Sequence, residues 1–160
     1  MAQNLPDIDG MVIVTTPQDV ALLDSRKSIT FANSLKVDVI GVIENMSGYT
    51  VRGKAPSGTE IELAAPGGKT IRVTADEEGH WFGTLDIFKS GGGEKTAEEF
   101  GVPFLGKLPF DPGFVRGGDD GVHRIVSEPE GASSQAFANV VAEIQTRVES
   151  GSTDGGLEII

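Results

Sequence analysis

Two short runs of apolar and β-branched residues enclose a stretch with helical periodicity, and this arrangement constrains the fold more than any other feature. The runs are residues 10–16 and 37–43. Each has the composition of a strand that is buried on both faces of a parallel sheet. The interval carries apolar residues at helical spacing as far as about Lys36, and such strand–helix–strand units are right-handed almost without exception. The sequence therefore predicts an α/β fold with a parallel sheet.

The helix between these runs is predicted to begin at the sequence Thr16-Pro17-Gln18-Asp19. The Thr16 side chain can cap a helix, and Pro17 suits the first helical position. Asp19, three residues after Thr16, would complete a capping box. We therefore expect helix from Pro17 onward.

The stretch 49–85 changes to a period of two. Ile61 and Leu63 alternate with polar residues, and a second alternating run follows a Pro-Gly-Gly turn. Alternation between turn residues predicts an antiparallel β hairpin or a small meander. The chain's one tryptophan, Trp81, also lies here. We interpret it as a residue that packs this small sheet rather than one that stacks on a ligand.

The α/β pattern returns after residue 86. A short helix at 94–100 is predicted to end at Gly101, and a strand follows at 104–108. Residues 110–121 are rich in Gly, Asp and Pro and predict a loop. The last helix has apolar residues on one stripe: Phe137, Val140, Val141, Ile144 and Val148.

The composition excludes several kinds of site and partner. Acidic residues outnumber basic ones by 24 to 13, which gives a net charge of −11 and disfavours nucleic acid as a partner. There is no cysteine, so disulfides, thiol nucleophiles and cysteine-held metals are excluded, and two histidines are too few for a histidine-built metal site. No apolar run is long enough to cross a membrane, and the start of the sequence lacks the features of a secretory signal. We therefore expect a cytoplasmic chain with no membrane partner.

Two glycine-bearing segments have part of the pattern of a phosphate-binding loop. Residues 101–108 have the spacing G-x4-G-K, but Leu108 replaces the Ser or Thr that would hold magnesium. In residues 91–96, Lys-Thr opens a helix, but the Glu94 carboxylate would repel the anion. A helix N-terminus with three glycines can still bind an anion weakly. The alternatives there are a weak anion site and a plain flexible cap, and the residues alone indicate no catalytic machinery.

Five blocks of the sequence resemble the Mrp-type iron–sulfur cluster carrier ATPases. In the family's order they are GMVIVTTPQDVALLDSRK (10–27), GVIENMS (41–47), DIFKSGGGEK (86–95), GVPFLGKLPFDP (101–112) and RGGDDG (116–121). The family consists of deviant P-loop NTPases related to MinD and to the nitrogenase iron protein. The resemblance implies a mostly parallel sheet wrapped by helices and a homodimer that binds ATP near the subunit interface. It also implies a role in iron–sulfur cluster assembly or transfer, with assembly or recipient proteins as partners.

The resemblance further implies where the nucleotide would bind. Asn45, directly after a strand, would contact the adenine edge, since an amide can both donate and accept hydrogen bonds. Pro109 and Asp111 would line the same pocket together with Leu108. The alternative for Asn45 is a turn amide that caps the local backbone. At the carboxyl end of the first strand, where open α/β sheets place ligands, three further residues are implied: Thr16, Pro17 and Gln18. No catalytic residue and no metal ligand is predicted.

The sequence departs from the family pattern in two places. In the family, the glycine-rich Walker A loop with its lysines and the Asp switch that holds Mg²⁺ precede the first block, and this sequence does not contain them. Phosphoryl transfer depends on that cradle of amides, lysine and metal, so we expect weak ATP binding by the adenine side and no hydrolysis. The family's Cys-x-x-Cys lies between the second and third blocks, an interval filled here by residues 49–85 without a cysteine. Iron–sulfur cluster binding in the family's manner is therefore not expected.

The leading hypothesis is that the chain is the C-terminal half of an Mrp-type ATPase. Residues 1–48 and 86–150 would form an incomplete P-loop NTPase-like α/β domain, 49–85 an inserted β element, and 151–160 a flexible tail. The alternative is a non-enzymatic interaction module, in which the remaining α/β fold carries the β insert as a docking element that pairs through its edge. A third hypothesis is a decayed remnant without activity.

Overall fold

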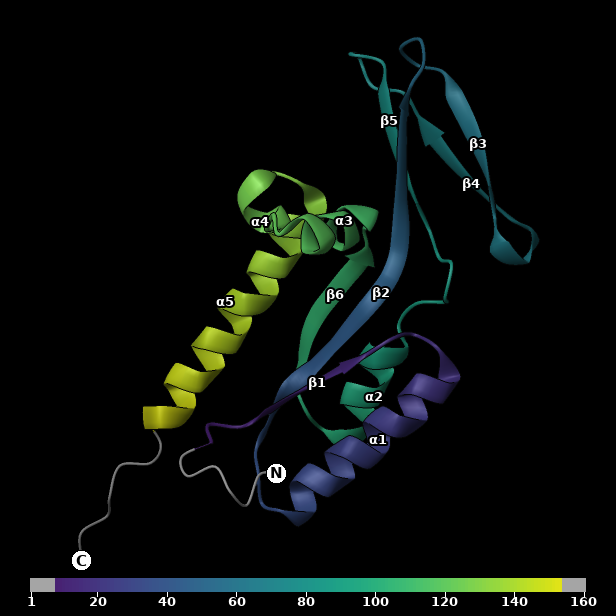
Figure 1. The fold of residues 1–160 in the computed structure, drawn as a ribbon. Coiled ribbons are helices and arrows are strands. Elements are labelled where there is room, and N and C mark those ends of the chain that lie inside the picture. The colour runs from purple at the N-terminus through teal and green to yellow at the C-terminus, as the bar shows by residue number, and fades with distance from the viewer. Residues whose placement is uncertain (1–7, 154–160) are drawn as a thin grey trace, which may run out of the picture.

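A central strand with a parallel neighbour on each side organises the computed structural model, which describes residues 8–153 (Figure 1). The central strand is β2 (Val39–Lys54), and it lies between β1 (Met11–Thr15) and β6 (Phe104–Phe110). A fourth strand, β5 (His80–Leu85), is antiparallel to the outer half of β2. The predicted α/β fold with a parallel sheet is confirmed.

Helices cover both faces of the sheet (Figure 1). Helices α1 (Asp19–Ser34) and α2 (Gly92–Phe100) lie on one face, and α5 (Ala132–Thr153) lies on the other. Two shorter helices, α3 (Pro112–Asp120) and α4 (Arg124–Ser127), follow β6. Among residues 8–153, no helix combines the length and apolar character that a membrane span requires.

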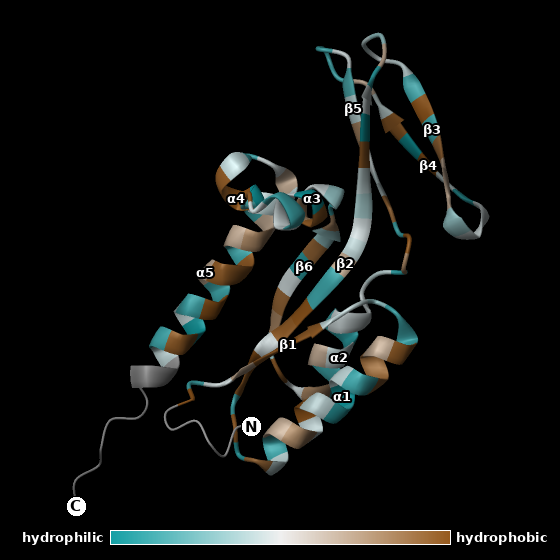
Figure 2. Ribbon diagram, viewed as in Figure 1, coloured by the Kyte–Doolittle hydropathy of each residue, from teal (hydrophilic) through white to brown (hydrophobic). Residues whose placement is uncertain are grey.

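The two faces of β2 build two separate cores. Val42 is fully buried with Ile29 of α1 and Ala97 of α2, whereas Ile43 packs with Leu105 and Val140 on the α5 side. Consecutive side chains of a strand point to opposite faces, so the part of β2 that is covered on both sides carries apolar side chains at Val42 and Ile43 in succession. Figure 2 shows this as brown residues along β1 and the adjoining part of β2.

The predicted antiparallel hairpin is also confirmed. Strands β3 (Glu60–Ala65) and β4 (Lys69–Thr74) form a separate two-stranded sheet that projects away from the helices (Figure 1). The hairpin packs on β5 at Gly83, where an added Cβ would lie 2.5 Å from Leu63 Cδ1 and 3.3 Å from Val73 Cγ1. The absence of a side chain at Gly83 therefore lets the hairpin approach β5 closely.

One strand runs through both the parallel sheet and the outer ribbon. The first part of β2 pairs with β1 and β6, and residues 49–54 pair with β5. The boundary that the sequence suggests before residue 49 thus falls inside a strand. The backbone is irregular just before it, because Met46 and Gly48 have positive φ angles of 56° and 84°. Local kinks of this kind bend a strand and re-aim its side chains.

The predicted start of α1 is wrong. The helix begins at Asp19, and its N-cap position is Gln18, whose side chain makes no capping hydrogen bond. Thr16 Oγ1 instead lies 3.3 Å from Gln18 Oε1, and Pro17 precedes the helix. The capping pattern therefore placed the start of the helix two residues too early. The helix ends at Ser34, before the expected end at about Lys36.

The predicted loop at residues 110–121 is wrong, because most of it forms α3. Asp111 caps this helix, since its Oδ1 accepts a hydrogen bond of 2.7 Å from Gly113 N. Pro112 takes the first helical position, and Gly121 ends the helix with a φ of 69°. The residues that suggested a loop are therefore start and stop signals of a short helix.

The last helix is longer than its sequence pattern indicated. Helix α5 continues to Thr153, so the first residues of the predicted tail 151–160 are helical, and residues 154–160 lie outside the described residues. Of the predicted apolar stripe, Val140 is 4% exposed, whereas Phe137 and Val141 are 37% and 38% exposed. The stripe therefore covers the sheet only in part.

Candidate functional site

Three of the residues predicted at the nucleotide site line one cavity of about 260 Å³: Asn45, Pro109 and Asp111. Asn45 follows the buried part of β2, and the other two stand at the end of β6. Because β2 and β6 are parallel neighbours and Asn45 pairs with Leu108, Asn45 lies beside the carboxyl end of β6, and open α/β sheets bind ligands beyond the carboxyl ends of their strands.

Most of the remaining wall of this cavity is apolar. It is formed by Met46, Leu108, Phe110, Phe114, Val115, Ser133 and Phe137. The rings of Phe114 and Phe137 are tilted by 31° with their centroids 6.2 Å apart. Sites for drug-sized ligands usually measure roughly 300–1,000 Å³. A smaller cavity with aromatic walls suits one flat ring system rather than a complete nucleotide.

The Asn45 side chain is fixed to its own turn. Its Oδ1 accepts a hydrogen bond of 2.9 Å from Met46 N, and Met46 has the positive φ noted above, which is uncommon for a residue other than glycine. The amide thus caps the local backbone, as one of the two sequence interpretations expected. Only the carbonyl end of the amide is used in this bond, and its amino end carries two donors that suit the acceptor nitrogens of a purine.

Asp111 is held by a network of its own. Its Oδ2 lies 3.6 Å from Arg124 Nε, and both side chains are largely buried. Burial opposes ionisation, but hydrogen bonds from Gly113 N and Ser133, with the charges of Arg124 and Arg52, outweigh it and lower the pKa of Asp111. The carboxylate is therefore ionised at neutral pH and stabilises the cavity wall through the start of α3.

The other three predicted site residues lie at the end of β1, away from this cavity. Thr16 lines a groove of about 500 Å³ along β1 and α1, which Asn45 also lines. Gln18 lines a larger hollow of about 970 Å³ that reaches the turn of the β3–β4 hairpin. Pro17 is fully buried. The structure thus divides the six predicted residues between different surfaces.

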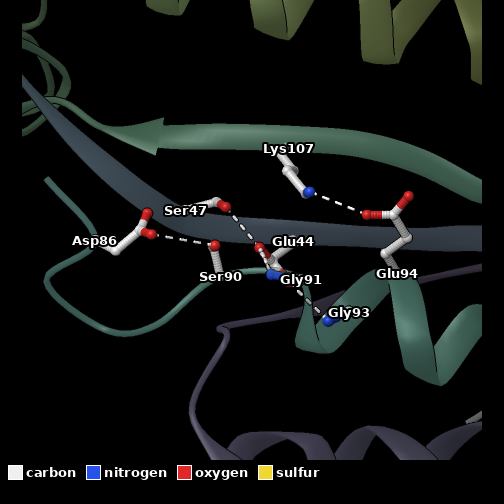
Figure 3. Close-up of polar contacts among 8 residues, drawn as sticks. All are labelled: Glu44, Ser47, Asp86, Ser90, Gly91, Gly93, Glu94 and Lys107. Carbon is white, nitrogen blue, oxygen red and sulfur yellow. Dashed lines mark hydrogen bonds and ion pairs between the residues drawn. The ribbon is translucent and has the colours of Figure 1, made fainter. Parts of the chain in front are cut away.

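A buried carboxylate beside Asn45 was not predicted from the sequence. Glu44 is 0% exposed, and Figure 3 shows its side chain at the N-terminus of α2. Its Oε1 accepts hydrogen bonds from Ser47 Oγ at 2.5 Å and from Gly91 N at 3.0 Å, and its Oε2 accepts one from Gly93 N at 2.7 Å. Negative charge is favourable at a helix N-terminus, where unpaired N–H groups gather.

The glycine-rich segment at residues 91–93 uses its backbone amides to bind the Glu44 carboxylate. Burial alone would raise the pKa of Glu44, but the hydrogen bonds from Ser47, Gly91 and Gly93 outweigh burial and lower it. The amides of Gly91 and Gly93, considered above as a weak anion site, therefore hold an anion that belongs to the chain itself. A Cβ at Gly93 would lie 3.0 Å from Glu44 Cβ, so glycine permits the close approach. The available signal was the charged residue at the end of a buried strand, which must find donors.

A second charged pair lies near this segment. Lys107 Nζ lies 3.0 Å from Glu94 Oε2, as Figure 3 also shows. Within residues 8–153, no three His, Asp or Glu side chains form a group that could hold a metal ion.

Comparison with known proteins identifies the family of this chain. Residues 1–71 and 73–145 match the ParA family model, which is described as a NUBPL iron-transfer P-loop NTPase. The chain is 36% identical over 147 residues to an iron-sulfur cluster carrier protein of Methanocaldococcus jannaschii, covering 92% of this chain and 41% of that protein. It is 36% identical over 148 residues to the protein of that name from Synechocystis, covering 92% of this chain and 34% of the relative. The chain thus spans about two fifths of these relatives or less.

Two solved structures share the fold. The cell division ATPase MinD of Pyrococcus furiosus superposes with a TM-score of 0.53 at 18% identity, covering 86% of this chain and 43% of that one. MinD of Pyrococcus horikoshii, complexed with Mg-ADP, gives a TM-score of 0.54 at 18% identity, covering 94% and 45%. The structural likeness establishes a shared α/β fold. Because the family model matches almost the whole sequence, the chain belongs to the ParA family.

Proposed function

We propose that this chain forms the base-binding side of the nucleotide site in an Mrp-type iron–sulfur cluster carrier ATPase, as the C-terminal portion of that protein. The observation that carries the proposal is the convergence of Asn45, Pro109 and Asp111 on one cavity, where the buried part of β2 ends beside the carboxyl end of β6. The names of the relatives support the cluster-carrier role. The MinD structure with Mg-ADP supports a nucleotide as the ligand of this fold.

The cavity would bind the base and leave the rest of the nucleotide outside. The aromatic walls at Phe114 and Phe137 suit the faces of a purine, and the amino end of Asn45 suits a ring nitrogen at its edge. The bound ATP would supply the phosphoanhydride bond for hydrolysis. The residues described here would only orient its base.

Hydrolysis would need groups that this sequence does not contain. No G-x4-G-K-[ST] motif occurs in the sequence, and the amides of Gly91 and Gly93 are already bonded to Glu44. We therefore propose that the chain alone binds adenine compounds weakly and has no ATPase activity. The iron–sulfur cluster is the cargo of the complete protein, and this chain, which has no cysteine, would not hold it through thiolates. A homodimer, recipient or assembly proteins as partners and a cytoplasmic location complete the proposal.

Calorimetric titration of the purified chain with adenosine tests base binding directly, because adenosine has no phosphate. We expect saturable binding that the substitution Asn45→Ala weakens by about tenfold or more, the effect of one lost hydrogen bond in a closed site. Asn139→Ala, on the exposed side of α5, is the matched control and should bind like the unaltered chain. Equal binding by the Asn45 variant, or no binding by any form, would refute the proposal.

A second candidate function is a docking module, and one observation favours it. Phe82 is 73% exposed on β5, in the ribbon that projects with the hairpin beyond the helices (Figure 1). Replacing residues 60–74 with a short glycine linker would remove β3 and β4. Loss of self-association with unchanged adenosine affinity would support docking through this element. Unchanged association, measured by light scattering, would contradict it.

A further inference from the structure

Three of the chain's six arginines line one hollow of about 420 Å³. Arg52 comes from the outer half of β2, Arg116 from α3 and Arg124 from α4. Arg52 is distant in the sequence from Arg116 and Arg124, and all three belong to a chain with a net charge of −11. A local concentration of positive charge against such a background calls for a specific explanation.

The three arginines differ in how they are held. Arg124 is an anchored residue, because its Nε lies 3.6 Å from Asp111 Oδ2 and its Nη1 pairs with Glu128. Its guanidinium also lies against Gly113, where an added Cβ would be 2.6 Å from Arg124 Cζ. Arg52 and Arg116 are exposed, and neither has an ion-pair partner among the residues between 8 and 153. The hollow thus has three guanidinium groups and a single carboxylate, Asp111, on its walls.

Hydroxyl groups complete the wall with further donors. Tyr49 and Thr50 line the same hollow, and each has an O–H that can donate to an anion. A guanidinium group presents a planar fork of N–H donors that matches two oxygens of a phosphate. We propose that this hollow is a binding site for a phosphate group, either as the free ion or on a small phosphorylated molecule.

The site is distinct from the proposed purine cavity although the two adjoin. They share Phe110, Asp111 and Ser133, but the arginines line only the second hollow, and Asn45 lines only the first. Because Arg52 lies on the ribbon and the other two arginines lie on α3 and α4, a bound phosphate would tie the outer half of β2 to the helices that follow β6.

The test follows the arginine Nε–Hε signals of the full chain by NMR during a titration with inorganic phosphate, against sodium chloride at equal ionic strength. We expect the signals of Arg52, Arg116 and Arg124 to shift together and saturate. Arg72, which is paired with Glu62 at 2.8 Å on the hairpin, should not respond. The absence of a saturable shift, or an equal response at Arg72, would overturn the proposal.

Variants locate the site. The double substitution Arg52→Ala and Arg116→Ala removes two exposed side chains and should weaken phosphate binding by at least about tenfold, whereas Arg72→Ala should not change it. The double substitution to Lys keeps the charge but removes both forks, so we expect weakened binding there too. Phosphate affinity that is unchanged in either double variant would overturn the proposal.

Two further titrations identify the source of the phosphate and separate this proposal from the purine site. Tighter binding of glycerol 3-phosphate than of inorganic phosphate would assign the site to a phosphorylated small molecule, and equal or weaker binding would assign it to the free ion. Adenosine should not displace phosphate. Adenosine binding by the double Ala variant should be unchanged, so either proposal can fail without the other.

Discussion

The indole ring of Trp81 covers Gly53, its partner across the β2–β5 ladder, and an added Cβ at Gly53 would lie 2.4 Å from Trp81 Cζ2. An aromatic ring over a cross-strand glycine shields backbone that would otherwise weaken the pair. This geometry agrees with the interpretation of Trp81 as a packing residue and ties the two strands of the ribbon together.

The substitution Gly53→Ala should displace the indole ring. Forcing a methyl group into occupied space costs typically about 1–3 kcal/mol, so we expect the unfolding free energy to fall by that amount. The fluorescence of Trp81, the chain's one tryptophan, should shift to longer wavelength in the folded protein. Gly118→Ala is the control, because an added Cβ there meets nothing within 4 Å and alanine favours helix. An unchanged Trp81 spectrum in Gly53→Ala would contradict the packing role.

The substitution Glu44→Gln should loosen the start of α2. Glutamine keeps the size of the side chain, but it loses the charge and turns an NH₂ group toward one of the glycine N–H donors. Hydrogen bonds to charged groups contribute about 1.5–3 kcal/mol, so we expect a loss of that order in chemical denaturation. Amide hydrogen exchange at Gly91 and Gly93 should become faster. Glu98→Gln, on the exposed side of α2, should change neither quantity.

Stability should depend on pH through the same carboxylate. The pKa of Glu44 is lowered from its ordinary value of 4.5, so the unfolded state takes up the proton first as the pH falls. The stabilisation is therefore complete above pH 4.5 and is lost as the pH falls through the lower folded-state pKa. Denaturant melts between neutral and acidic pH should show this decline. The decline should be smaller in Glu44→Gln, and equal declines in both proteins would contradict the assignment.

Asp111 should matter more as a helix cap than as a charge. Asp111→Ala removes the acceptor of Gly113 N and leaves Arg124 without this partner, which should cost about 1–2 kcal/mol. Asp111→Asn keeps a capping oxygen and should cost less. Thermal melts of the two variants provide the comparison. Equal losses would show that the ion pair with Arg124, rather than the cap, stabilises α3.

The central strands were predictable because burial on both faces of the sheet produces a run of consecutive apolar residues in the sequence. Burial on both faces requires apolar side chains at Val42 and Ile43 alike, and this requirement is visible in the sequence without any partner. The outer half of β2 was not predictable in the same way. Gly53 is a poor strand residue by itself, and the ring that covers it comes from Trp81 on another strand.

The candidate site was predictable only in part for the same reason. The hydrogen bond between Gly93 N and Glu44 joins residues 49 positions apart, so no local sequence pattern predicts it. The grouping of Asn45, Pro109 and Asp111 was predicted from family resemblance. The parallel pairing of β2 with β6 explains why these residues lie close together. Helix α3 was missed because glycine and aspartate signal loops and helix ends alike.

The anion that binds the glycine turn before α2 is the side chain of Glu44, which is covalently part of the same chain. The conformation of this turn therefore does not depend on the salt or phosphate content of the surroundings, since the balancing charge can neither diffuse away nor be exchanged. An anion from solution could bind to the Gly91 and Gly93 amides only by displacing the Glu44 side chain. Any anion that the protein binds is therefore expected at another site.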